Sequence, residues 1–157
     1  MSGDLSIRPY QPADAAALSA LYEASVRGLG VRDYAPAQIE AWASLAPSPD
    51  DLERRMADGR TRLVAIAEDI IGFIDMEADG HIDLLYVAPA AAGAGVARTL
   101  VQTAEALAPM SDATRLYAEA SETARPVFER LGYSVIARRD FEVAGVPIHN
   151  WAVEKAL

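Results

Sequence analysis

The segment YVAPAAAGAGVARTLV, residues 86–101, passes from an apolar run through a proline and two glycines into a helical pattern. Gly93 and Gly95 permit positive φ angles or a close approach of another backbone. A helix that begins directly after them presents unpaired N–H groups and a partial positive charge. The segment therefore predicts an anion-binding loop. A tight connection between a strand and a helix is the alternative, since short glycine patterns are common.

β segments precede this loop and follow it. Apolar runs interrupted by turns at Asp69 and at Asp79–Gly80 predict an antiparallel meander, with strands over residues 61–68, 70–78 and 81–89. After the loop helix, the pattern predicts a strand over 114–120, a helix over 124–131 that Gly132 ends, and a terminal hairpin of residues 133–143 and 147–155.

The N-terminal part reads as a strand over residues 5–10 followed by helices. Helical spacing begins near Pro12 and again near Pro36, and Ser48 with Asp51 forms a capping box around Pro49. The order of elements predicts an α/β fold with a mixed, mostly antiparallel sheet and flanking helices. We expect one domain over residues 1–157, because the length suits one hydrophobic core.

Composition narrows the function classes. The chain has no cysteine, which excludes disulfides and thiolate chemistry, and its two histidines do not suggest a metal site. With 14 Lys and Arg against 23 Asp and Glu, the formal net charge of -9 disfavours nucleic acid and anionic membranes and favours a cationic substrate. We find no signal-like or membrane-spanning run and expect a cytoplasmic location.

Three ordered segments carry a family resemblance. The segments LSIRPYQPADAAALSALY, LLYVAPAAAGAGVARTLV and YAEASETARPVFERLGYSVIAR resemble the first strand and helix, the acetyl-CoA loop and the later strand–helix element of the GNAT acetyltransferase superfamily. The family's loop pattern has Arg or Gln, two residues, Gly, any residue, then Gly or Ala, and it falls here on Ala92, Gly95 and Ala97. The resemblance implies a V-shaped gap between the fourth and fifth strands that holds acetyl-CoA as co-substrate.

The resemblance also implies which residues bind the cofactor. The backbone of Leu85 and Val87 would pair with the pantetheine arm, and Val87 N–H would hold the oxyanion. Backbone N–H groups after the loop would bind the pyrophosphate, with Arg98 as the first side-chain candidate and Arg125 or Arg130 as others. The full cofactor set is Leu85, Val87, Gly93, Ala94, Gly95, Val96, Ala97, Arg98, Ser121, Thr123, Arg125 and Phe128.

Two positions depart from the family pattern. Ala92 stands where the family usually has Arg or Gln, so one side-chain contact to the pyrophosphate is lost. Phe128 stands where the family often has the Tyr that protonates the departing thiolate, and a phenyl ring cannot donate a proton. The remaining hydroxyls that can serve as the acid are Tyr86, Tyr117, Ser121 and Tyr133, unless the thiolate leaves unaided.

The acceptor amine must lose a proton before it attacks the thioester. Asp83 is the first candidate base, because period-2 alternation puts it on the same face as Leu85 and Val87 unless a bulge intervenes. A solvated strand face is the alternative for this carboxylate. Candidate contacts to the acceptor come from Tyr34 and from polar residues of other strands, namely Asp75, Glu77, His149 and Asn150. Trp42 is expected to pack in the core.

We predict an acetyl-CoA-dependent N-acetyltransferase that acts on a primary amine of a small molecule or protein, with a homodimer as one assembly. Ala92 and Phe128 leave a second interpretation open, a non-catalytic acyl-CoA-binding domain with the same fold.

Overall fold

The strands predicted before the glycine loop form the expected antiparallel meander in the computed structural model, which describes residues 4–157. The meander consists of β2 (Thr61–Ala67), β3 (Asp69–Met76) and β4 (His81–Val87). Apolar side chains point to both faces of β2 and β3, because helices cover the sheet on both sides. The prediction of these three strands is confirmed.

The described part of the chain contains seven strands, which form one mixed sheet in the order β1-β2-β3-β4-β5-β7-β6. The four strands outside the meander are β1 (Ser6–Pro9), β5 (Arg115–Ala120), β6 (Ser134–Val143) and β7 (Val146–Ala156). β4 and β5 are parallel, and every other neighbouring pair is antiparallel. The predicted mixed sheet and the terminal hairpin are therefore confirmed.

In residues 4–157, five α-helices flank the sheet: α1 (Ala15–Leu29), α2 (Pro36–Ala43), α3 (Pro49–Arg55), α4 (Val96–Leu107) and α5 (Arg125–Arg130). Short 3-10 helices complete the chain: η1 (Pro12–Asp14), η2 (Gly30–Arg32), η3 (Met56–Asp58), η4 (Pro89–Ala91) and η5 (Ala108–Met110). The capping box predicted at Ser48 is present, with Asp51 N–H donating to Ser48 Oγ at 3.0 Å. Within the described residues, no helix has the length and apolar character needed to cross a membrane.

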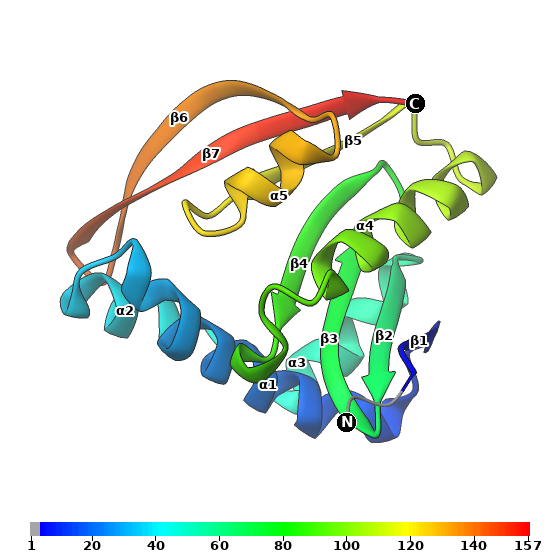
Figure 1. Ribbon diagram of the computed structural model, residues 1–157, viewed down its shortest axis with the longest axis horizontal. Helices are drawn as coiled ribbons and strands as arrows, with labels where there is room; N and C mark the ends of the chain where they lie inside the picture. The colour runs from blue at the N-terminus through cyan, green and yellow to red at the C-terminus, as the bar shows by residue number, and fades with distance from the viewer. Residues whose placement is uncertain (1–3) are drawn as a thin grey trace.

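The hydrophobic core lies in two layers, one on each face of the sheet (Figure 1). α4 and α5 cover one face, where Leu100 and Phe128 are buried against the sheet. α1, α2 and α3 cover the other face, where Leu18 and Leu52 are fully buried. The layer in which a buried strand residue packs therefore shows on which face of the sheet its side chain lies.

The parallel pair β4–β5 is short. Only His81–Tyr117 and Ile82–Ala118 are in register, and beyond them the strands diverge (Figure 1). Gly80 secures the closed end: its carbonyl accepts from Tyr117 N–H at 3.1 Å, and a Cβ there would lie 2.0 Å from the carbonyl oxygen of Arg115. Its φ of +97° also favours glycine. The expected V-shaped gap between β4 and β5 is thus present.

Candidate active site

A cavity of about 950 Å³ follows the gap between β4 and β5. Both strands line it, together with the glycine loop, the start of α4, η2 and parts of α5, β6 and β7. Its lining includes Val96 and Phe128 of the core layer under α4 and α5 and Trp42 and Ile148 of the layer under the N-terminal helices, so the cavity reaches both faces of the sheet. One cavity therefore connects the α4 side with the side of the N-terminal helices.

The glycine loop forms the end of the cavity on the α4 side. Gly93 and Gly95 have φ angles of +80° and +81°, and among the described residues only their chain neighbours lie within 4 Å of the position that a Cβ would take. Gly95 is the N-cap of α4, so the first N–H groups of the helix have no partner within it. The loop is open, and its donors face a space that an anion can enter.

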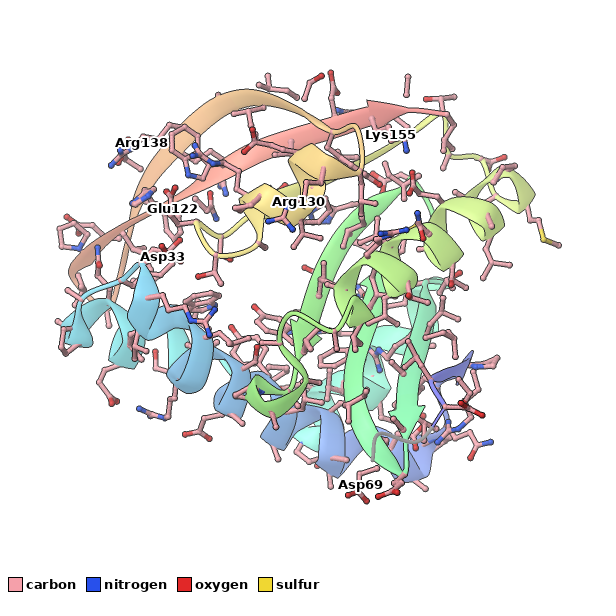
Figure 2. The ribbon with its side chains drawn as sticks, in the orientation of Figure 1. Asp33, Asp69, Glu122, Arg130, Arg138 and Lys155 are labelled. Atoms are coloured by element: carbon pink, nitrogen blue, oxygen red, sulfur yellow. The ribbon has the colours of Figure 1, made fainter. Side chains whose placement is uncertain are left out.

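Two arginines stand at the same end, Arg98 on α4 and Arg130 on α5, and both line the cavity. Figure 2 shows Arg130 on the side of α5 that faces the gap. Within residues 4–157, neither guanidinium has a carboxylate oxygen within 4.0 Å. Ala92 also lines the cavity and is exposed, which leaves room beside the loop.

The backbone of β4 presents free polar groups to the gap. Ala88 N–H donates to Ile71 O at 2.8 Å, toward β3. Because N–H and C=O groups of successive strand residues point to opposite edges, those of Leu85 and Val87 point toward β5. β5 has diverged at this level, so an extended molecule with amide groups can pair with this edge of β4.

Aromatic side chains line the cavity on the side of the N-terminal helices. Tyr34 is buried, and its hydroxyl donates to His149 O and accepts from Glu122 N–H, both at 2.9 Å. Burial raises the pKa of Tyr34 above its ordinary value. Trp42, which the sequence assigns to the core, is half-buried and forms part of this wall. The tyrosine thus joins the helices to β7 and to the turn before α5.

Asp83 lines the cavity, but on the face opposite to the one predicted. The register passes from Met76–Ile82 to Asp75–Leu84, so Asp83 is the extra residue of a β-bulge. Ile82 and Leu85 therefore both pack toward α4, whereas Asp83 lies with Leu84 on the side of the N-terminal helices. The predicted shared face with Leu85 is wrong for this reason. Its proposed role as base stays a prediction.

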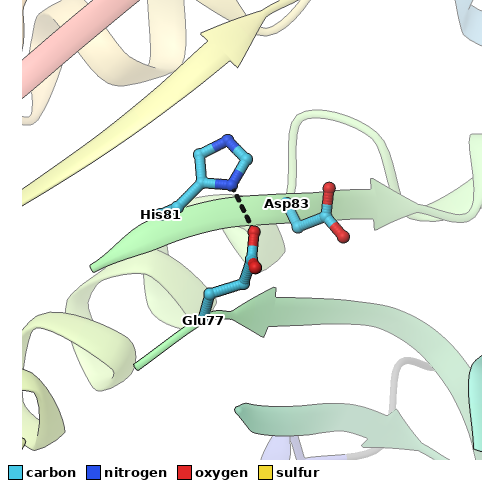
Figure 3. A group of neighbouring side chains, drawn as sticks. All are labelled: Glu77, His81 and Asp83. Carbon is cyan, nitrogen blue, oxygen red and sulfur yellow. Dashed lines mark hydrogen bonds and ion pairs between the residues drawn. The ribbon is translucent and has the colours of Figure 1, made fainter. Parts of the chain in front are cut away.

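Glu119 on β5 lines the opposite wall of the gap. Its Oε1 lies 2.9 Å from His81 Nε2, and His81 Nδ1 lies 2.6 Å from Glu77 Oε1 (Figure 3). The hydrogen bond to Glu119 is the main cause that raises the pKa of His81 to about 9, and in turn lowers that of Glu119. This carboxylate is not among the residues predicted from the sequence, although the alternation of polar and apolar residues in β5 indicates its face.

Glu77, His81 and Asp83 bring potential metal-ligand atoms within 4.8 Å of one another. The guanidinium of Arg60 already lies among them, with Nη1 at 3.0 Å from Asp83 and Nη2 at 3.8 Å from Glu77. Figure 3 shows His81 bonded to Glu77 and separate from Asp83. These contacts account for the cluster as a set of ion pairs, and we assign no metal to it.

Several predicted residues lie away from the cavity. Asp75 is fully buried and paired with Arg62 at 2.7 Å and Arg60 at 2.6 Å, so it cannot contact an acceptor in this arrangement. Arg125 lies over the ring of Trp151, with carboxylates of Glu122 and Glu129 at 3.4 and 3.3 Å. Among residues 4–157, the lining set also leaves out Glu77 and Ala94.

Of the four hydroxyl residues predicted as candidate acids, two line the cavity and two lie away from it. Tyr117 bonds to Asp79 outside the cavity, and Tyr133 is buried against Phe128 at a ring distance of 5.0 Å, away from the lining. Tyr86 and Ser121 do line the cavity. Burial holds the pKa of Tyr86 well above its ordinary value, so its hydroxyl keeps its proton.

Ser121 and its neighbours form the β5–α5 turn. Ser121 Oγ accepts from Ala124 N–H at 3.0 Å, which leaves its own proton free to donate. Thr123 Oγ1 donates to Asp33 Oδ2 at 2.8 Å. Figure 2 shows Asp33 and Glu122 close to each other in this region. The remaining predicted residues that line the cavity are Val96, Ala97, Phe128, His149 and Asn150.

Comparisons with known proteins agree with this geometry. Residues 31–155 match the family described as acetyltransferase (GNAT) domain. The chain is 30% identical over 148 residues to the uncharacterized N-acetyltransferase YafP of Escherichia coli strain K12, covering 94% of this chain and 93% of YafP. A solved GCN5-related N-acetyltransferase from Rhodopseudomonas palustris is 34% identical, with a TM-score of 0.90 and coverage of 100% of this chain and 98% of that one.

A more distant structure has the same fold. YncA of Salmonella typhimurium, solved with acetyl-CoA, is 19% identical, with a TM-score of 0.76 over 97% of this chain and 93% of YncA. The family match covers most of the chain, and the divergent parallel strands and the loop before α4 agree with it. The chain belongs to the GNAT acetyltransferase family and is an N-acetyltransferase.

Proposed function

We propose that the protein transfers an acetyl group from acetyl-CoA to a primary amine. The observation that carries this proposal is the single cavity through the β4–β5 gap, with anion-binding groups at one end and carboxylates at the other. Acetyl-CoA supplies the activated acetyl group, and the residues of this chain bind, orient and handle protons around it. Family relatives solved with acetyl-CoA support this choice of donor.

The α4 end fits the phosphates of CoA. The open glycine loop and the helix start offer N–H donors, and Arg98 and Arg130 offer charge that no carboxylate within 4.0 Å neutralises in the described part of the chain. The two arginines compensate for Ala92. The pantetheine amides then pair with the backbone of Leu85 and Val87 along the free edge of β4.

The chemistry takes place where the gap crosses the sheet. The amine nitrogen forms a bond to the thioester carbon, the C–S bond breaks, and CoA leaves as the thiol after it gains a proton. Val87 N–H stabilises the carbonyl oxygen, and Asp83 or Glu119 removes the proton from the incoming ammonium. Of the hydroxyls predicted as the acid, Tyr86 and Ser121 line the cavity and can protonate the thiolate.

The proposal is tested with purified protein, acetyl-CoA and a panel of amines that includes polyamines, amino acids and arylalkylamines. We expect acetyl-CoA to raise the melting temperature, since ligand at 100 times its Kd stabilises by about 2.7 kcal/mol. We also expect amine-dependent release of CoA thiol and an acetylated product detected by mass. Binding without release for any amine would instead support the non-catalytic acyl-CoA-binding function suggested by Phe128.

A further inference from the structure

Most of the basic side chains in the described part of this chain pair with a carboxylate, and those that do not pair line the cavity. Ten of the fourteen Lys and Arg side chains have a carboxylate oxygen within 4.0 Å in the described part of the chain. The four without one are Arg32, Arg98, Arg130 and Arg139, and all four line the cavity. In a protein with 23 acidic residues, unpaired arginines in one cavity indicate that anionic ligands bind there.

Arg98 and Arg130 are accounted for by the CoA phosphates, but Arg139 lies on the other face of the sheet. It is two residues before Phe141 on β6, and Phe141 packs in the core layer of α1, α2 and α3. Its partner across the strand pair is Asn150, two residues after Ile148 of the same layer. Arg139 therefore lies in the half of the cavity on the side of the N-terminal helices. This half, where the acceptor would bind, is called the acceptor half.

Arg139 and Asn150 together form a set of donors. Arg139 Nη1 donates to Asn150 Oδ1 at 3.0 Å, which orients the guanidinium and satisfies the only acceptor atom of the amide side chain. Within the described residues, the remaining N–H groups of both side chains have no hydrogen-bond acceptor and can donate to a ligand. A carboxylate, which offers acceptor oxygens alone, matches this set. Arg32 in η2 adds a second positive charge to the cavity lining.

Carboxylates face the same half of the cavity from the β4 and β5 walls. Asp83 and Glu119 line it, and the charge of Arg139 contributes, after the hydrogen bond from His81, to lowering the pKa of Glu119. The acceptor half thus holds negative groups that suit an ammonium and a positive group that suits a carboxylate. Trp42 and Ile148, which also line the cavity, offer apolar surface.

We propose that the acceptor is a small amino carboxylate with an apolar side chain, whose carboxylate binds Arg139 and Asn150 and whose amine faces Asp83 and Glu119. This inference rests on the proposed acetyl transfer and specifies its substrate class. The net charge of the chain favours a cationic acceptor such as a polyamine, and this inference differs from that expectation. A polyamine would place a second ammonium next to Arg139 and Arg32. Like charges in one cavity discriminate against such a ligand.

The experiment measures kcat/KM for matched pairs of acceptors that differ only in the carboxylate. The pairs are L-phenylalanine and 2-phenylethylamine, L-tryptophan and tryptamine, L-leucine and isopentylamine, with spermidine as the dicationic comparison. We expect at least one amino acid to exceed its decarboxylated partner by about 10-fold to 100-fold, the range typical of hydrogen bonds to charged groups. Spermidine should be the poorest acceptor.

Arg139→Gln should reduce that preference at least tenfold, mainly through KM for the amino acid. Arg138→Gln is the matched control, because Arg138 precedes it on β6, is exposed, pairs with Asp140 at 3.1 Å and is outside the set of lining residues in 4–157. Arg139→Lys, which keeps the charge, should restore part of the preference. Melting temperatures of all variants establish that they fold.

The outcomes separate the two proposals. Turnover of spermidine or of decarboxylated amines at rates equal to or above those of the amino acids would overturn the inference and leave acetyl transfer intact. The same holds if Arg139→Gln and Arg138→Gln change the preference equally. Acetyl-CoA binding with no turnover of any amine would overturn both the inference and the proposed function.

Discussion

Asp83 and Glu119 face the gap from opposite strands and have different partners. Asp83 Oδ2 lies 3.0 Å from Arg60 Nη1, whereas Glu119 is held by the imidazole of His81. Arg60 is almost fully buried and also pairs with Asp75. Its side chain is therefore held in place and cannot move together with that of Asp83. A carboxylate that accepts a proton from the acceptor must do so next to Arg60 or His81.

We predict that Asp83→Asn lowers kcat/KM for the amine at pH 7 by about 100-fold or more, because general bases typically contribute that much. The Kd of acetyl-CoA should not change, since Asp83 lies on the face away from α4. Steady-state kinetics between pH 6 and 10 and titration with acetyl-CoA measure both quantities. Asp69→Asn, at the far end of β3 in Figure 2, is the control. An unchanged rate and pH profile in Asp83→Asn would transfer the role to Glu119.

His81 adds a pH-dependent term to stability. Its pKa is raised from 6.5 to about 9 in the folded protein, so the folded state holds the proton more tightly than the unfolded chain. The stabilisation is complete below about pH 6.5 and is lost as the pH rises through about 9. We predict that His81→Gln is less stable than the wild type by up to about 3 kcal/mol at pH 6, since one pKa unit corresponds to 1.36 kcal/mol.

Urea unfolding at pH 6, 7.5 and 9.5 measures this difference, which should shrink at the highest pH. His149→Gln, at the other histidine, is the comparison. A difference between wild type and His81→Gln that is the same at all three pH values would show that His81 acts through packing against Tyr117 alone, whose ring lies 4.9 Å away.

Among the elements, the loop before α4 has the backbone conformation expected of an anion-binding loop, but Ala92 stands where the family usually has Arg or Gln. Gly95 has the positive φ that the N-cap of α4 requires, while Ala92 is exposed in an extended conformation that any residue can adopt. We predict that Ala92→Arg tightens acetyl-CoA binding about tenfold, by adding a charge-assisted hydrogen bond to the phosphates.

Calorimetric titration with acetyl-CoA tests this change. Ala90→Arg is the matched control, because Ala90 is exposed on η4 and outside the described residues that line the cavity. An equal gain in both variants would mean that the added charge acts at long range, and no gain in Ala92→Arg would place the phosphates elsewhere.

For the whole molecule, the connection between the two halves of the sheet depends on few contacts. β4 and β5 share two residue pairs, and the open side of the gap is crossed by the hydroxyl of Tyr34, which bonds to the turn before α5 and to β7. We predict that Tyr34→Phe lowers the free energy of unfolding by about 1–3 kcal/mol, because the partly buried N–H of Glu122 and C=O of His149 lose their partner.

Thermal unfolding with and without acetyl-CoA measures this loss. Tyr10→Phe is the control, since the Tyr10 hydroxyl bonds to Glu53 in an exposed position. Equal effects of the two changes would mean that the Tyr34 hydroxyl does not stabilise the connection across the gap.

Much of the fold follows from local patterns. The capping box at Ser48, the turn at Gly80 and the glycine loop are set by residues a few positions apart, so they were predictable without knowledge of the packing. The family resemblance, carried by three such segments, is confirmed by the match over residues 31–155. The roles predicted for individual site residues stay predictions.

The errors came from contacts between distant segments. Asp75 was predicted as a possible acceptor contact, but Arg60 and Arg62 come from β2 and the turn before it, and together they bury the carboxylate. Trp42 packs against the core layer of the N-terminal helices, as its spacing predicts, and the divergence of β4 and β5 leaves a cavity on its other side that the pattern did not predict. Neither outcome can be read from the spacing of apolar residues within one element.

The amino-acid order alone established the elements, the glycine loop and the divergence from the family at Ala92 and Phe128, because helix and strand periodicity and the φ freedom of glycine are local properties. The faces and partners of the charged residues depended on the assembled sheet. A bulge that inserts Asp83 reverses side-chain direction along β4, and the pairing of β6 with β7 brings Arg139 beside Asn150. Register and strand divergence result from packing across the whole molecule, and they determine which of the fourteen cations remain free for a ligand.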